Sequence, residues 1–157
     1  MMEACHERLH RMLVLLTRLR EHLPAHGADE QAQQAARDAM KYFDQAAPQH
    51  HRDEELHVFP PVEGGPQGDM VRKLRSDHEQ MESQWADVRA LLGRIARGEQ
   101  HVLSAQDASA LDAFATLYQS HIADEERIAY PAARALLDAP ALQAMGQEMS
   151  QRRGGPR

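Results

Sequence analysis

The sequence predicts an all-α protein, an up-down-up-down four-helix bundle made of two repeated helical hairpins. Aromatic residues make up only 4% of the 157 residues, and the β-branched residues that strands favour are scarce. Apolar residues recur at steps of three and four along four separate stretches, the period of an amphipathic helix. The second half of the chain also repeats the pattern of the first, which indicates two hairpins of similar design.

The first hairpin is predicted to pair a helix over Glu3–Leu23 with a longer helix over Asp29–Phe59. Leucines and methionines form the apolar stripe of the first helix, which Pro24 and Gly27 should end. The aspartate that begins the second helix suits an N-cap, and the Pro-Pro pair after its last residue should stop it. Pro48 inside this helix predicts a kink.

The second hairpin follows a glycine-rich loop and is predicted to begin at Asp69, which can cap the third helix. Gly98 should end that helix. Ser104 with Asp107 resembles a capping box and should begin the fourth helix, whose stripe runs to Leu136.

The chain is long enough for one domain with a real core and too short for two. We therefore expect a bundle over residues 1–140, followed within residues 141–157 by a short helix and a disordered tail. The tail, Arg152–Arg157, is rich in arginine and glycine.

Composition narrows the partners and the compartment. A net charge of -6 and a pI near 5.9 offer no basic patch, so nucleic acid is not expected as a partner. No apolar run approaches the roughly 20 residues that cross a bilayer, and no secretory leader precedes the first helix. Cys5 is the single cysteine and cannot form an internal disulfide. The expectation is a cytoplasmic protein without a membrane partner.

The repeat is most specific near the ends of the second and fourth helices. His50 follows His6 by 44 residues, and His121 follows His78 by 43. Each later histidine opens the same pattern at the same offsets: His50, Glu54, Glu55, Phe59 and Pro60 match His121, Glu125, Glu126, Tyr130 and Pro131.

This repeat predicts a dinuclear metal site in the middle of the bundle. Residues four apart on a helix share a face, so His50 with Glu54 and His121 with Glu125 point into one space. Packing the hairpins together adds His6 and His78, which lie on the other two stripes. Imidazole suits iron, zinc and copper, and a carboxylate can bridge two ions roughly 3.5–4 Å apart.

A single histidine on an apolar stripe is more often a core residue than a ligand. Four imidazoles and two carboxylates are different, because burying them unpaired would cost several kcal/mol per charge against a net stability of about 5–15 kcal/mol. Metal ligation by the whole set is the better interpretation.

At these residues the sequence resembles the hemerythrin family in its bacterial form, the HHE cation-binding domain. The resemblance covers about Cys5 to Leu136, and its most specific element is the doubled histidine, two glutamates and Phe-Pro or Tyr-Pro. It implies a left-handed bundle with two iron ions, oxo- or hydroxo-bridged. By position, the four histidines would be terminal ligands, and Glu54 and Glu125 would be the bridging carboxylates.

Two positions depart from the oxygen-carrying members of that family. Glu82 stands where they have a second histidine on the third helix, and Glu125 comes four residues after its histidine where they have an aspartate after five. Glu82, His10 and His22 stay open as additional ligands. A second four-spaced pair, His51 with Glu55, lies off the apolar line.

The function expected from these features is binding or sensing of a small diatomic, oxygen or nitric oxide, at a di-iron centre. The alternative is a redox enzyme, with a redox partner, or an iron-handling or iron-sulfur repair protein acting at the same centre. Whether the protein is an enzyme stays open. A third interpretation is a helical interaction module with a structural metal such as zinc.

Overall fold

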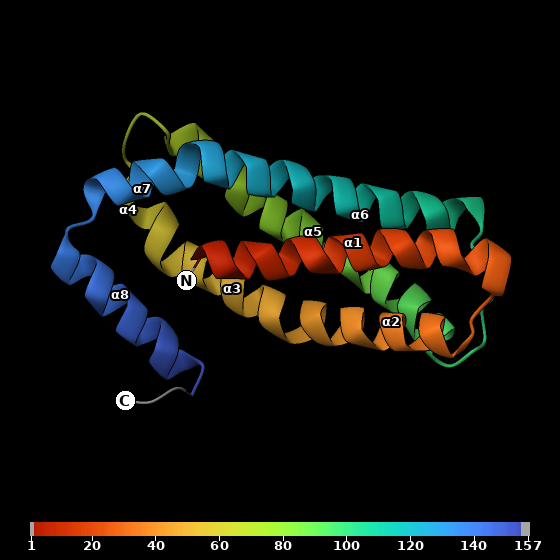
Figure 1. The fold of residues 1–157 in the computed structure, drawn as a ribbon. Coiled ribbons are helices and arrows are strands. Elements are labelled where there is room, and N and C mark those ends of the chain that lie inside the picture. The colour runs from red at the N-terminus through yellow and green to blue at the C-terminus, as the bar shows by residue number, and fades with distance from the viewer. Residues whose placement is uncertain (1, 155–157) are drawn as a thin grey trace.

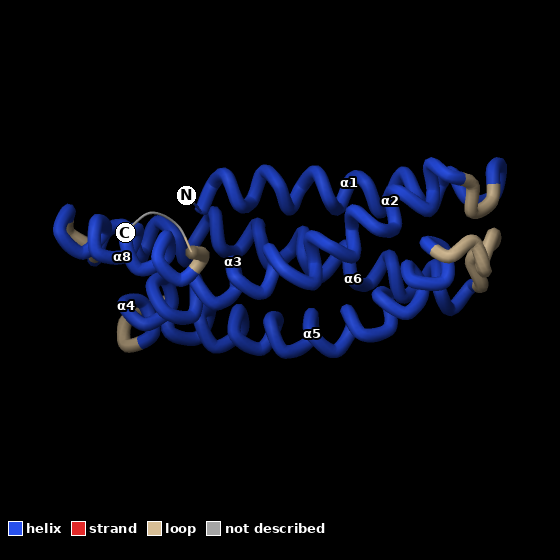
Figure 2. The backbone as a smooth tube through the Cα atoms, turned by 90° about the horizontal axis from the view of Figure 1, so that it is seen from below, coloured by secondary structure: helices blue, strands red, loops and turns tan. Residues whose placement is uncertain are grey.

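The computed structural model describes residues 2–154, and this part of the chain is almost entirely helical, with loops at the ends of the bundle (Figure 2). Four long helical runs pack side by side and alternate in direction, so the predicted four-helix bundle is confirmed (Figure 1). A last helix, α8, lies at one end of the bundle, near α4 (Figure 1). The elements are α1 (Met2–His26), α2 (Glu30–Lys41), η1 (Tyr42–Ala46), α3 (Ala47–Asp53), η2 (Glu54–Val58), α4 (Phe59–Glu63), α5 (Gly68–Ala96), α6 (Ala105–Asp124), η3 (Glu125–Ala129), α7 (Tyr130–Leu136) and α8 (Ala139–Arg152), where η marks a π-helical segment.

Two of the predicted helix caps are confirmed, whereas Asp69 does not cap α5, which begins at Gly68 with Gln67 as its N-cap. Asp29 caps α2 by accepting from the amide of Ala32, and Ser104 caps α6 by accepting from the amide of Asp107. The expected end of the first helix at Leu23 is wrong, because α1 continues to His26 with Pro24 inside its last turn. There the missing N–H of proline removes only one helical hydrogen bond.

Three short π-helical segments let the second and fourth helical runs continue past prolines. The residue before each proline donates its amide to the carbonyl five residues back, from Ala47 to Tyr42, Phe59 to Glu54 and Tyr130 to Glu125. A proline ring clashes with the carbonyl four residues back in a regular α-helix, and the wider turn relieves that clash. The prediction that the Pro-Pro pair after Phe59 ends its helix is therefore wrong.

The apolar core is divided along the bundle by a band of buried polar residues. One cluster includes Leu9, Ala47 and Met81, and the other includes Val58 and Leu74. The polar residues lie between the two clusters along each helix, and all six predicted ligands are buried: His6, His50, Glu54, His78, His121 and Glu125.

Helix α8 is docked onto the bundle by charge and by one apolar anchor. Met149 is fully buried, and Glu148 pairs with His57 on η2. Arg152 and Arg153 both pair with Asp53, a carboxylate with 0% exposure. The first two residues of the predicted disordered tail are thus placed by ion pairs, and residues 155–157 lie outside the described part. Within residues 2–154, no helix is long and apolar enough to span a bilayer.

Candidate metal centre

The six predicted residues meet in the band between the two apolar clusters. They form two groups of potential ligand atoms, and within each group the atoms all lie within 4.8 Å of one another. His6 and His50 belong to one group, His78 and His121 to the other, and Glu54 and Glu125 belong to both. Each hairpin therefore supplies two histidines to its own half-site, and both half-sites share the two carboxylates. The assignment of these residues as ligands stays a prediction.

The second half-site has the hydrogen bonding expected of metal-binding imidazoles. His78 Nδ1 lies 3.0 Å from Glu55 Oε1, and His121 Nδ1 lies 2.9 Å from Asp77 Oδ2. A ring that donates from Nδ1 to a carboxylate carries its lone pair on Nε2. The two Nε2 atoms face each other at 3.2 Å. Two lone pairs at that distance repel unless a proton or a metal cation lies between them.

His6 repeats this arrangement in the first half-site. Its Nδ1 lies 3.0 Å from Glu126 Oε1, and its Nε2 lies 3.2 Å from Glu125 Oε1. Glu126 matches Glu55 in the repeat, so the glutamate after each shared carboxylate orients a histidine of the other hairpin. Such outer carboxylates fix the tautomer and raise the basicity of a metal-binding imidazole.

His50 breaks the pattern. Among residues 2–154 neither of its ring nitrogens has a hydrogen-bond partner, although the ring is only 3% exposed. The equivalent histidine, His121, is held by Asp77, and the repeat places Cys5 where Asp77 stands. Two unsatisfied buried nitrogens are costly in a protein interior. A metal ion bound at Nε2 would satisfy one of them.

The charges of the centre are strongly coupled. Burial opposes ionisation of Glu54, but His50, His121 and His78 outweigh burial and hold the pKa of Glu54 well below its usual value. Burial also lowers the pKa of His121, yet its hydrogen bonds to Asp77 and Glu54 prevail and the net pKa is raised. The metal-free site therefore favours a proton on His121, and binding of a metal there would release that proton.

Tyr130 brings a hydroxyl group into the first half-site. It donates a hydrogen bond of 2.7 Å to Glu54 Oε2, and its oxygen lies 2.9 Å from His6 Nε2. Burial and the nearby Glu54 raise the pKa of Tyr130, so it stays a neutral donor. The matching position in the other half-site is Phe59, whose ring packs 5.5 Å from that of His78. Apart from the ligands, the two half-sites therefore differ in polarity.

His51 lies beside the centre although it was expected to lie off the apolar line. Its ring stacks on His78 with the centroids 4.1 Å apart, and its Nε2 lies 3.4 Å from the Tyr118 hydroxyl. Burial and repulsion from His78 lower the pKa of His51 well below its usual value, which keeps this ring neutral. It belongs to neither group of potential ligands.

The residues left open as additional ligands lie away from the centre. Glu82 is exposed on α5, and His10 is exposed on α1. His22 pairs with Asp29 near the opposite end of α1 and stacks on His26. None of these three residues belongs to a group of potential ligands among the described residues.

The donor set fits a pair of metal ions. Four imidazoles and two shared carboxylates suit iron, zinc or copper, and carboxylates common to two half-sites suit bridging. Sequence reasoning did not assign Glu55, Glu126, Asp77 or Tyr130 a place at the site. The repeated second glutamate was the signal for the first two. Tyr130 stood in the repeat opposite Phe59, but the repeat did not mark Asp77, since Cys5 takes its place in the other hairpin.

Fold and site together define a four-helix bundle with a buried histidine and glutamate centre able to bind metal. Residues 1–133 match the family described as Hemerythrin HHE cation binding domain. An uncharacterized protein of Haemophilus influenzae is 32% identical over 155 residues, which cover 98% of this chain and 88% of that protein. The chain belongs to the hemerythrin HHE cation-binding domain family, and the resemblance noted in the sequence is confirmed.

Proposed function

We propose that this protein is a non-haem di-iron protein that binds or senses a small diatomic, oxygen or nitric oxide. The observation that carries the proposal is the pair of donor groups that share Glu54 and Glu125. Two histidines for each ion and two shared carboxylates give each ion four protein ligands. Iron favours about six, so positions are left for an exogenous ligand.

The roles of the surrounding residues follow from their contacts. Iron, when bound, supplies exchangeable coordination positions and two accessible oxidation states. Glu126, Glu55 and Asp77 hold the Nδ1 atoms of His6, His78 and His121 and aim the Nε2 atoms inward. Tyr130 holds one oxygen of Glu54 through its hydroxyl group. The two apolar clusters cover the band from both sides along the bundle.

The test is to load the purified protein with iron, measure metals by elemental analysis and record absorption spectra with and without oxygen and azide. We expect roughly two irons per chain and near-ultraviolet charge-transfer bands that change with the added ligand. A colourless protein that excludes iron, or one that holds zinc in preference, would refute the proposal.

Redox turnover or iron donation at the same centre is the second candidate. The Tyr130 hydroxyl favours it, because a neutral O–H group that donates to the shared carboxylate Glu54 can supply a proton to the centre. An external redox partner would then have to supply electrons. Steady-state assays with peroxide or nitric oxide and a chemical reductant separate turnover from simple binding.

A further inference from the structure

Two pockets approach the centre from different parts of the fold. The His78 pocket has a volume of about 430 Å³ and is lined by residues of η1, α3, η2, α5 and α6, among them His51, His78, Trp85 and Tyr118. The α8 pocket has a volume of about 350 Å³ and lies between α8 and the end of the bundle, with Tyr130 in its wall. A small ligand from solvent could use either route.

The His78 pocket reaches the metal centre directly. His78 is one of the six predicted ligands, and it is part of the pocket wall. The neighbouring wall is formed by His51, which stacks on His78, and by Tyr118, whose hydroxyl lies 3.4 Å from His51 Nε2. A molecule in this pocket therefore lies against the half-site of His78 and His121.

The α8 pocket stops at Tyr130. None of the six predicted ligands is among its described lining residues. Tyr130 is 4% exposed, and its hydroxyl group is held between Glu54 and His6. Met149 of α8 forms part of the pocket wall. The ion pairs of Arg152 and Arg153 with Asp53 hold α8 against the bundle. The tyrosine and α8 thus separate this pocket from the half-site of His6 and His50.

The rim of the His78 pocket is acidic. Four carboxylates line it together with one cation, Arg52: Asp44, Glu55, Glu79 and Glu82. Asp44 is paired with Arg89 and Glu55 is bonded to His78, so the excess negative charge comes from Glu79 and Glu82. Glu79 and Glu82 are exposed and come from the same face of α5. A rim of this sign repels anions and leaves neutral molecules such as oxygen or nitric oxide unaffected.

We propose that small exogenous ligands reach the centre through the His78 pocket and bind in the half-site of His78 and His121. The acidic rim slows anions relative to neutral diatomics, and Tyr130 closes the other half-site. This inference rests on the proposed di-iron function and adds the route and the half-site that receives the ligand.

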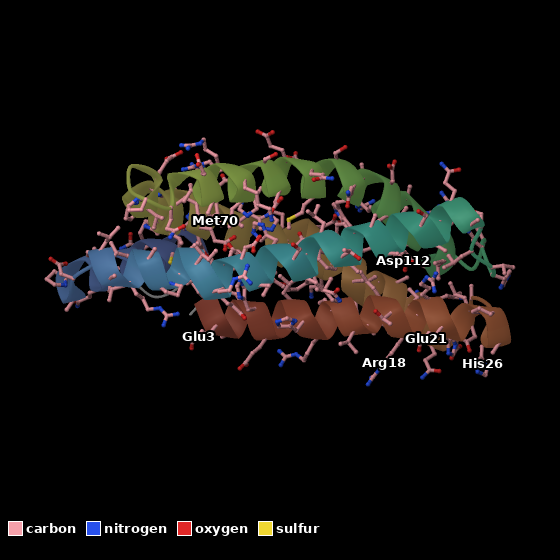
Figure 3. All side chains as sticks on the ribbon, turned by 90° about the horizontal axis from the view of Figure 1, so that it is seen from above. Glu3, Arg18, Glu21, His26, Met70 and Asp112 are labelled. Atoms are coloured by element: carbon pink, nitrogen blue, oxygen red, sulfur yellow. The ribbon has the colours of Figure 1, made fainter. Side chains whose placement is uncertain are left out.

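The test compares matched charge reversals at the two pockets, Glu82→Lys and Glu3→Lys, in the iron-loaded protein. Both side chains are exposed, each lines one pocket, and each change alters the charge by the same amount. Figure 3 shows Glu3 on the outer side of α1, at its N-terminal end. Azide association is followed by stopped-flow absorbance, with nitric oxide as the neutral probe.

We expect Glu82→Lys to raise the azide association rate about 3–10-fold at low ionic strength. Most of that gain should vanish in about 1 M salt, where the Debye length is about 3 Å. Glu3→Lys should leave the azide rate unchanged, and neither variant should alter the nitric oxide rate. An equal or larger effect of Glu3→Lys, or no effect of Glu82→Lys, would overturn the proposed route.

A second pair of variants tests the route by filling the pockets. His51→Trp should slow both azide and nitric oxide about tenfold or more, with the iron content unchanged. Gly146→Leu is the control in the α8 pocket, where a Cβ atom added at this glycine meets nothing within 4 Å. Slowing by Gly146→Leu and not by His51→Trp would refute the inference. If the wild-type protein holds no iron, or shows no azide band, the proposed function itself fails.

Discussion

His50 provides a sharp test of the centre because its buried ring lacks hydrogen-bond partners among the described residues. Burial lowers the pKa of His50, so the ring is neutral at about pH 7.5 and does not supply, at that pH, the positive charge that favours ionised Glu54, whose Oε2 lies 3.6 Å from Nε2. Each unsatisfied buried nitrogen costs about 1–3 kcal/mol, or about 2–6 kcal/mol for the two. His50→Leu removes both nitrogens and keeps a similar side-chain volume. Imperfect packing of the branched side chain should lower the free energy of unfolding by about 1–3 kcal/mol. The limits of these two ranges place the metal-free variant between about 1 kcal/mol less stable and about 5 kcal/mol more stable than the wild type, and the expected result is a gain near the middle, about 2 kcal/mol.

The assay is urea and thermal unfolding of the metal-free and the iron-loaded proteins. For a chain of this size the melting temperature should rise by about 2–4 °C for each kcal/mol. Iron at 100 times its dissociation constant stabilises a protein by about 2.7 kcal/mol. His50→Leu lacks one ligand, so its gain on iron loading should be smaller than that of the wild type.

The matched control is His121→Leu, the same change at the equivalent position of the other hairpin. His121 is bonded to Asp77, a carboxylate only 6% exposed, so this variant leaves a buried charge with one partner fewer. It should destabilise the metal-free protein by about 1–3 kcal/mol. If both variants destabilise the metal-free protein equally, the unpaired nitrogens of His50 cost nothing and the reasoning is wrong.

Three further predictions test the shared carboxylates, a helix cap and the docking of α8. Glu54→Ala should reduce the bound iron from roughly two ions to near zero, since Glu54 belongs to both groups of potential ligands. His6→Ala should spare the second half-site and retain roughly one ion, and elemental analysis measures both iron contents. Ser104→Ala removes the cap of α6 and should cost about 1 kcal/mol in urea unfolding without changing the iron content. Arg152 and then His57 lower the pKa of Glu148 from 4.5 to about 2, so this carboxylate stabilises docking above about pH 4.5 and loses that effect as the pH falls toward 2. The protection factors of the α8 amides, which correct for the slower intrinsic exchange in acid, should therefore fall between pH 5 and pH 3 in the metal-free protein, and Glu148→Gln should remove that part of the pH dependence.

Helix positions and the convergence of the six residues could be predicted because both follow from local periodicity. Apolar residues at steps of three and four define the inner face of each helix. His50 and Glu54 lie on that face four residues apart, and the other hairpin repeats this spacing. The same repeat contained Glu55 and Glu126, whose contacts with His78 and His6 needed the relative placement of the hairpins.

The π-helical segments and the docking of α8 could not be predicted in the same way. Proline ordinarily ends or kinks a helix, and whether a wider turn absorbs it depends on the packing of the residues on both sides. Asp53 and Arg152 are 99 residues apart, and no local pattern pairs two charges at that separation. The buried Asp53 explains why arginines expected in a disordered tail are instead placed against the bundle.

The places where the two hairpins differ explain why the two half-sites should behave differently. In the second hairpin Asp77 orients the ring of His121 and makes it more basic. Cys5 stands at the matching position of the first hairpin, so among the described residues no carboxylate holds the ring of His50 by a hydrogen bond. Tyr130 stands at the position that Phe59 takes in the other hairpin, so a hydroxyl group lies beside His6. Both differences fall on the half-site of the first hairpin. The half-site of His78 and His121 combines the better-oriented ligands with the pocket that reaches one of them, and this combination is what binding of an exogenous ligand requires.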